Sequence, residues 1–165
     1  MSKNALLVID VQKYYINEHT KNIPRKIEDF IKQNNFDFIL FTKFVNHKNS
    51  NMYKVFNWSK MMSSLDTDIC DNLIQFVQKD KVFQKDTYSV FKTEQFRDFL
   101  KNNNIGELTL CGLDADACIL ATAYDGFDLG YKIHVLDELT GCHVGEEFRK
   151  DVMWEKNLEN MDWKL

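Results

Sequence analysis

The chain has 165 residues, of which 44% are hydrophobic and 13% aromatic, and its formal net charge is −4. This size and apolar content predict a single folded domain over residues 1–165 and exclude a disordered chain. The lysines are scattered, so we expect no nucleic-acid partner, and the apolar runs are too short to cross a membrane. The absence of a basic and apolar leader predicts a cytoplasmic protein.

The first half of the chain begins with a continuous apolar run at residues 4–11, which predicts a buried strand. Residues 23–31 have apolar side chains at helical spacing after Pro24 and predict an amphipathic helix. A second strand is predicted at residues 37–45. Residues 46–66 are polar and irregular, and we expect a long loop or lid there.

The middle of the chain repeats this alternation. A helix is predicted at residues 69–77 and a short strand at residues 81–84. Thr93 is a candidate N-cap for a helix that carries Phe96, Phe99 and Leu100, and residues 107–113 predict the fourth strand.

The last third predicts a helix at residues 116–129 that ends at Gly130, a strand at 131–137 and a helix at 145–159, with the final residues as a candidate edge strand. Strands that alternate with helices predict an α/β fold. We expect a three-layer α-β-α arrangement, Rossmann-like, around a mostly parallel sheet of five or six strands.

Reactive side chains follow three of the predicted strands. Asp10 closes the first, Lys85 follows the third, and Cys118 lies just beyond the fourth. Ligands bind at the carboxyl ends of the strands in such sheets, so these three groups are expected to meet. Cys118 would lie in the first turn of a helix, where free N–H groups and a nearby ammonium favour a thiolate. Asp10 could then accept its proton; the alternative is three unrelated residues.

Three segments resemble motifs of the isochorismatase-like cysteine hydrolases, which include nicotinamidases and N-carbamoylsarcosine amidohydrolase. Residues 6–12 (LLVIDVQ) resemble the opening strand of that family, and residues 85–91 (KDTYSVF) resemble K-x-x-Y-S-A-F. Residues 111–123 resemble C-G-x-x-T-D-x-C-V-x-x-T-A. The three occur in the family's order, and the resemblance extends from residue 5 to about residue 140.

The resemblance implies that Asp10, Lys85 and Cys118 form a catalytic triad. It also implies a cis peptide bond between Leu113 and Asp114, and an oxyanion hole made by the backbone amides of Asp114 and Cys118. No cofactor is implied, and the family's usual assembly is a homodimer or homotetramer.

The chain departs from the family pattern at several positions. Ala115 replaces the usual Thr, and Asp114 replaces a small apolar residue, which brings a negative charge close to the expected oxyanion unless Asp114 points away or is paired. Nicotinamidases carry an Asp-x-His metal segment where this chain has Phe44-Val45-Asn46, with His47 alone beside it. We therefore expect no catalytic metal and doubt nicotinamidase activity.

A substrate pocket is expected near these motifs, with candidates Gln12, Tyr15, Trp58, Tyr88 and Phe91. Ordinary core packing is the alternative, and it is favoured for Phe91. The four cysteines form no CxxC pair and no zinc-ligand spacing, which predicts free thiols.

The predicted function is hydrolysis of an amide or related C–N bond of a small molecule through an acyl-thioenzyme. One alternative is vinyl-ether hydrolysis of the isochorismate type, which need not use the cysteine. A second alternative is an inactive binding protein on the same fold. A nucleotide-binding domain ranks last because no G-x-G-x-x-G follows the first strand.

Overall fold

The computed structural model describes residues 2–156 and residue 158 of the chain. A five-stranded sheet forms its centre, in the order β3-β2-β1-β4-β5, and every neighbouring pair is parallel. The strands are β1 (Lys3–Ile9), β2 (Phe38–Phe44), β3 (Val82–Lys85), β4 (Ile105–Gly112) and β5 (Lys132–Thr140). The predicted α/β fold with a parallel sheet is confirmed. The candidate sixth strand falls outside the described residues.

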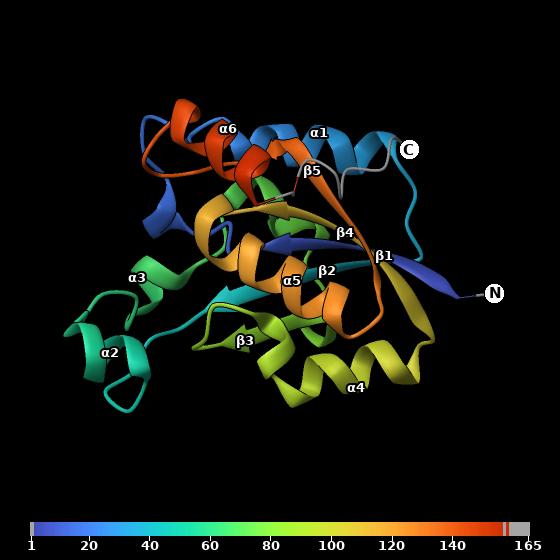
Figure 1. The fold of residues 1–165 in the computed structure, drawn as a ribbon, viewed down its shortest axis with the longest axis horizontal. Coiled ribbons are helices and arrows are strands. Elements are labelled where there is room, and N and C mark those ends of the chain that lie inside the picture. Colours follow the sequence, from blue (N-terminus) through green and yellow to red (C-terminus); the bar gives the residue numbers. More distant parts are fainter. Residues whose placement is uncertain (1, 157, 159–165) are drawn as a thin grey trace.

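Helices cover both faces of this sheet (Figure 1). They are α1 (Ile23–Gln33), α2 (Asn51–Phe56), α3 (Ser64–Thr67), α4 (Glu94–Asn102), α5 (Leu120–Asp128) and α6 (Glu146–Glu155). None of the helices in the described part of the chain combines the length and the apolar character that a membrane crossing requires.

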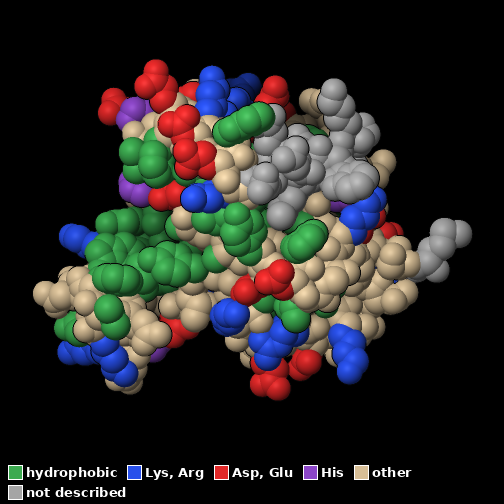
Figure 2. Space-filling model, viewed as in Figure 1, with side chains coloured by type: hydrophobic (Ala, Val, Ile, Leu, Met, Phe, Trp, Pro, Cys, Tyr) green, Lys and Arg blue, Asp and Glu red, His purple; other side chains and the backbone are tan. Residues whose placement is uncertain are grey.

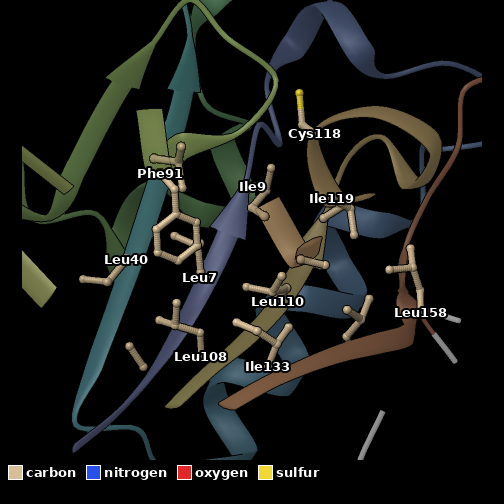
Figure 3. Close-up of a cluster of buried hydrophobic side chains, with 14 of the residues drawn as sticks. Leu7, Ile9, Leu40, Phe91, Leu108, Leu110, Cys118, Ile119, Ile133 and Leu158 are labelled. Carbon is tan, nitrogen blue, oxygen red and sulfur yellow. The ribbon is translucent and has the colours of Figure 1, made fainter. Parts of the chain in front are cut away.

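Two apolar cores lie on the two faces of the sheet, as the alternation of side chains along a strand requires. In β1, Leu7 and Ile9 pack into the core that α4 and α5 cover, whereas Leu6 and Val8 face the core that α1 covers. Figure 3 shows the first of these cores, with Cys118 at its end and its sulfur directed away from the cluster. The sheet therefore presents Cys118 beyond the carboxyl ends of its strands.

The segment 46–66, predicted to be a loop, contains the two short helices α2 and α3. Helix α2 begins there because Ser50 caps it, with its hydroxyl accepting the N–H of Tyr53 at 3.1 Å. The predicted helix at residues 69–77 is only a 3-10 helix, Asp71–Phe76. Its start is delayed because Ile69 forms an antiparallel bridge with Gln12 and the N–H of Cys70 donates to the Val11 carbonyl.

Two other boundaries differ from the prediction. The helix expected from residue 116 opens with a π-helical turn, Ala115–Ile119, before α5 begins. The fifth strand continues to Thr140 because its pairing with β4 resumes after an irregularity, with Thr140 beside Gly112. This extension brings residues 141–143 next to the turn that holds Cys118, since the N–H of Ala115 donates to the Gly141 carbonyl.

Candidate active site

The carboxyl ends of three parallel strands bring Asp10, Lys85 and Cys118 together. The Nζ atom of Lys85 lies 2.6 Å from Oδ2 of Asp10 and 3.2 Å from Sγ of Cys118. All three side chains are buried. The ammonium therefore contacts both the carboxylate and the thiol, and the expected meeting of these residues is observed.

Gly112 allows the fourth strand to end this close to the first. Its φ is +120°, and a Cβ at this position would lie 2.1 Å from the carbonyl oxygen of Ile9. Only glycine tolerates both the backbone conformation and the contact. The N–H of Leu113 then donates to the same Ile9 carbonyl at 2.9 Å, which fixes the Cys118 turn beside Asp10.

Asp10 is held by Thr42, a residue that the sequence analysis did not identify. The Thr42 hydroxyl donates to Oδ1 of Asp10 at 2.6 Å and accepts the backbone N–H of Asp10 at 3.1 Å. Asp10 itself leaves the strand with φ of 49°, a conformation that Asp tolerates better than most residues. The available signal was a buried hydroxyl in the second strand, directly after the apolar run Phe38–Phe41.

Lys85 has a hydrogen-bonding partner for each of its three N–H groups. Besides Asp10 and Cys118, it donates to the carbonyl of Thr87 at 2.9 Å, and its Nζ lies 5.2 Å from the centre of the Phe44 ring. Burial lowers the pKa of Lys85, but the charges of Asp10 and Cys118 and the hydrogen bonds to them outweigh it and raise the pKa above its ordinary value. The lysine is therefore held as a buried cation.

The surroundings of Cys118 shift its pKa in the direction opposite to the one that the helix N-terminus predicts. Burial raises the pKa of the Cys118 thiol, Asp10 raises it further, and Lys85 lowers it; the net direction is upward. The N–H groups of Ala117 and Ile119, on either side of Cys118, are both directed to the Asp114 carbonyl, at 3.2 Å. Burial and the Asp10 charge therefore favour the thiol form of Cys118 over the thiolate, against the effect of Lys85.

Both oxygens of the Asp114 carboxylate are hydrogen-bonded to His143. Asp114 is therefore paired, which is the condition under which its charge would not oppose an oxyanion nearby. Oδ1 of Asp114 accepts the backbone N–H of His143 at 3.0 Å, and Oδ2 lies 2.6 Å from Nδ1 of the imidazole. Burial raises the pKa of Asp114 while the imidazole lowers it, and the net direction is upward. The peptide bond between Leu113 and Asp114 is cis, as the resemblance implies.

A cavity of about 400 Å³ lies beside these residues, lined by Tyr14, Tyr15, Asn17, Trp58, Asp114 and His143. Burial raises the pKa of the Tyr15 phenol, and the nearby acidic groups of Asp10, Cys118 and Asp114 raise it further, so Tyr15 lies between the cavity and these buried residues. Hydrophobic side chains gather on the molecular surface between α3 and α5 (Figure 2). Tyr15 and Trp58 were expected in this pocket, whereas Tyr14, Asn17 and His143 were not.

Three of the expected pocket residues lie elsewhere. Gln12 is fully buried, and its side-chain amide joins two other segments of the chain. Nε2 donates to the carbonyls of Phe44 and Thr67, and Oε1 accepts the Phe44 N–H. The Phe91 ring packs in the core against Phe96 and Tyr131, the alternative favoured above. Tyr88 is 44% exposed and does not line this cavity. We therefore leave these three residues out of the pocket.

Residues 44–47, where the resemblance to nicotinamidases led us to look for metal ligands, make contacts within the protein instead. The Asn46 amide donates to the carbonyls of Trp58 at 2.7 Å and Lys60 at 3.0 Å, and this holds Trp58 at the cavity. His47 pairs with Asp86 at 2.8 Å. Elsewhere in the described part, Asp114, Cys142 and His143 have potential ligand atoms within 4.8 Å of one another. Asp114 and His143 are hydrogen-bonded to each other, and the Cys142 thiol donates to Oδ1 of Asp116 at 3.4 Å.

Comparison with known proteins places this geometry in context. The isochorismatase domain family matches residues 4–157 of the chain. Isochorismatase family protein 2A of Dictyostelium discoideum is 33% identical over 73 residues, which are 43% of this chain and only 36% of that relative. The match therefore spans well under two thirds of the relative's length.

Solved structures share the fold. An isochorismatase-like hydrolase from Alkaliphilus metalliredigens has a TM-score of 0.82 at 21% identity, covering 98% of this chain and 93% of that one. A nicotinamidase from Bacillus subtilis has a TM-score of 0.77 at 20% identity, covering 93% of each chain. At these identities the likeness establishes the architecture.

Proposed function

The chain belongs to the isochorismatase family, and from this premise we propose that it is a cysteine hydrolase that cleaves an amide or related C–N bond of a small molecule. One observation carries the proposal: a single buried ammonium, Lys85 Nζ, lies 2.6 Å from the Asp10 carboxylate and 3.2 Å from the Cys118 sulfur. This is the arrangement of a nucleophile, a base and a charge that stabilises both.

In the proposed first step, Asp10 takes the thiol proton as the sulfur attacks the substrate carbonyl. The raised pKa of Cys118 makes this proton transfer part of the attack rather than a preceding equilibrium. The Lys85 ammonium offsets the negative charge that would otherwise accumulate on sulfur and carboxylate together. The carbonyl oxygen becomes an oxyanion, which we assign to the backbone N–H groups of Asp114 and Cys118.

The intermediate then collapses with loss of the amine, which leaves with the proton held by Asp10. An acyl-thioenzyme remains on Cys118. Water, deprotonated by Asp10, attacks the thioester and releases the carboxylic acid, and the proton returns to the sulfur. The cycle is balanced: one water is consumed, and one amine and one acid are formed.

The pairing of Asp114 supports an active enzyme rather than an inactive relative of this fold. A free carboxylate beside the oxyanion would oppose the first step. Both oxygens of Asp114 are instead engaged by His143. The cavity of about 400 Å³ suits a small molecule with a planar or apolar part against Tyr14, Tyr15 and Trp58.

The test is turnover on a panel of small amides by the wild type, Cys118→Ala and the control Cys70→Ala, which alters a buried thiol in the core on the opposite face. We expect loss of turnover only in Cys118→Ala, and a mass increase equal to the acyl group on Cys118 when the wild type is quenched during turnover. A folded Cys118→Ala variant with wild-type activity would contradict the mechanism and favour the vinyl-ether alternative.

We further propose that residues 1–165 act as one domain in the cytoplasm, assembled as a homodimer or homotetramer. Large exposed apolar side chains on or beside α5 and α6 support an assembly: Tyr124, Phe127, Leu129, Phe148 and Trp154. The four free cysteines suit a reducing compartment. Light scattering after size exclusion gives the oligomeric state directly, and a monomer at micromolar concentration would contradict this part.

A further inference from the structure

We propose that His143 is a substrate-contacting residue that determines specificity: in the complex its ring is an imidazolium that donates from Nδ1 to Asp114 and from Nε2 to a carboxylate oxygen at the end of the substrate remote from the scissile bond. The inference rests on the proposed function, because it names a chemical feature of the substrate that the same site would accept. It is carried by the pairing of His143 with Asp114 and by the position of both residues in the wall of the cavity.

One nitrogen of the imidazole is committed to the protein. Nδ1 of His143 lies 2.6 Å from Oδ2 of Asp114, a carboxylate whose side chain is only 7% exposed. Since a carboxylate accepts, Nδ1 carries the proton of this hydrogen bond. Among residues 2–156 and 158, no hydrogen bond to Nε2 of His143 is observed, and the side chain is 55% exposed. The second nitrogen is therefore available to a ligand.

The backbone of His143 is fixed as firmly as its ring. Its N–H donates to Oδ1 of Asp114 at 3.0 Å, and its carbonyl accepts from the Asn17 amide at 3.0 Å. Asn17 is itself bound by the turn it begins, because its Oδ1 accepts the N–H groups of His19 and Thr20. A residue held at its backbone N–H, its carbonyl and one ring nitrogen, with the second ring nitrogen left for a ligand at the cavity, is preorganised for binding.

Charge balance favours an anionic partner. An imidazolium donates from both nitrogens, so it can meet the Asp114 carboxylate with Nδ1–H and a second carboxylate with Nε2–H, whereas a neutral ring with its proton on Nδ1 has no hydrogen on Nε2. The cavity is otherwise lined by the aromatic residues Tyr14, Tyr15 and Trp58, by Asn17 and by the Asp114 carboxylate that the imidazole engages, and none of these brings a positive charge. A substrate carboxylate that meets Nε2–H thus completes a chain from ligand through imidazole to Asp114.

It follows that the backbone and the side chain of Asp114 have different roles. Its backbone N–H belongs to the proposed oxyanion hole, and its side chain positions the imidazole that holds the far end of the substrate. Asp114, which departs from the family pattern, would then give this chain its selectivity for substrates with a carboxylate and would not impair the site.

The experiment uses two alkylating reagents that share a reactive head and differ only at the tail: N-iodoacetylglycine, which ends in a carboxylate, and N-iodoacetylglycinamide, which ends in an amide. The β-alanine homologues extend the reach by one methylene. The quantity measured is the ratio of the rates at which the two reagents modify Cys118, located by mass spectrometry and normalised to the same ratio for N-acetylcysteine.

We expect the wild type to favour the carboxylate reagent and His143→Gln to lower the ratio about tenfold, the value of one charge-assisted hydrogen bond. The matched control is His47→Gln, since His47 also pairs with an aspartate, Asp86 at 2.8 Å, but does not line the cavity. It should leave the ratio unchanged. Because the ratio compares two reagents in one variant, a general loss of reactivity cancels.

Three outcomes would overturn the inference. An equal ratio in the wild type and His143→Gln would show that His143 does not contact the tail, and an equal fall in His47→Gln would show a long-range charge effect. In both cases Cys118 still reacts and the proposed hydrolase stands. A Cys118 that neither reagent modifies in the wild type removes the nucleophile, and with it both the inference and the proposed function.

Discussion

Thr42 and Asp10 form a closed pair of hydrogen bonds between adjacent strands. The Thr42 hydroxyl donates to the Asp10 carboxylate at 2.6 Å and accepts the Asp10 backbone N–H at 3.1 Å. The hydroxyl is the only group seen to bond Oδ1 of Asp10 among the described residues, while Oδ2 is the oxygen that meets Lys85. One oxygen of the carboxylate is thus oriented by the sheet, which leaves the other for the lysine and the thiol.

Thr42→Val should therefore impair both folding and turnover. The substitution preserves shape but leaves a buried carboxylate oxygen and a buried N–H without a partner, which costs about 1–3 kcal/mol of unfolding free energy. We expect kcat to fall roughly tenfold as the carboxylate loses its orientation. Urea unfolding and steady-state kinetics measure the two effects. Thr42→Ser retains the hydroxyl and is the control; equal losses in both variants would contradict this role.

Gly112 provides a second prediction, on stability alone. Gly112→Ala places a Cβ 2.1 Å from the Ile9 carbonyl oxygen at φ of +120°, and we expect a loss of more than about 3 kcal/mol. Gly130→Ala is the control that measures the cost of backbone strain without a steric clash. Its φ is also positive, +84°, but a Cβ there meets nothing within 4 Å. Gly130→Ala should cost only about 1–2 kcal/mol in the same urea titration. Similar losses in both variants would rule out the close approach as the main cause.

Features of the fold that depend on neighbouring residues were predictable from the sequence, whereas contacts between residues far apart in the sequence were not. Strands and helices were largely predictable because their apolar periodicities are local, and the strand-end rule then brought Asp10, Lys85 and Cys118 to one edge of the sheet. The partners Thr42 and His143 were not predicted, since they meet Asp10 and Asp114 across 32 and 29 residues. No local pattern encodes such pairings.

The upward shift in the pKa of Cys118 was not predictable for a related reason. The argument from a helix N-terminus considers only nearby backbone, whereas the pKa of this thiol is raised first by burial, which depends on the whole fold. Gln12 illustrates the same limit: its position in a family motif indicated the pocket, but its amide is used entirely to join the chain at Phe44 and Thr67.

Asn46 connects the α2–α3 segment to the cavity, and its replacement should affect substrate binding. Asn46→Ala removes the hydrogen bonds to the carbonyls of Trp58 and Lys60, so the wall formed by Trp58 loses its anchor. We expect KM to rise about tenfold with a smaller change in kcat, and faster tryptic cleavage between residues 47 and 60. The control is Asn103→Ala, which removes the hydrogen bond that the Asn103 side-chain amide donates to the Phe99 carbonyl of its own helix. An unchanged KM would contradict the anchoring role.

The sharpest prediction concerns Asp10→Asn, which should change alkylation and turnover in opposite directions. The Asp10 charge raises the pKa of Cys118 and competes for Lys85, so its removal lowers that pKa and leaves the ammonium to the thiolate. Iodoacetamide should therefore modify Cys118 faster in Asp10→Asn at pH 8, and the rise of the rate with pH should begin earlier. Turnover should fall by at least about a hundredfold because no base remains to accept the proton.

The pH dependence of alkylation in the wild type measures the same effect of Asp10 on the Cys118 pKa. The wild-type thiol has a raised pKa, so its alkylation rate should still be increasing above pH 8.5, where an ordinary thiol is approaching its plateau. Lys85→Met serves as the opposite control, since loss of the ammonium removes a cation that lowers this pKa, and alkylation should slow at every pH. If Asp10→Asn slows alkylation as well, Asp10 supports the thiolate instead of withholding it, and the general-base mechanism fails.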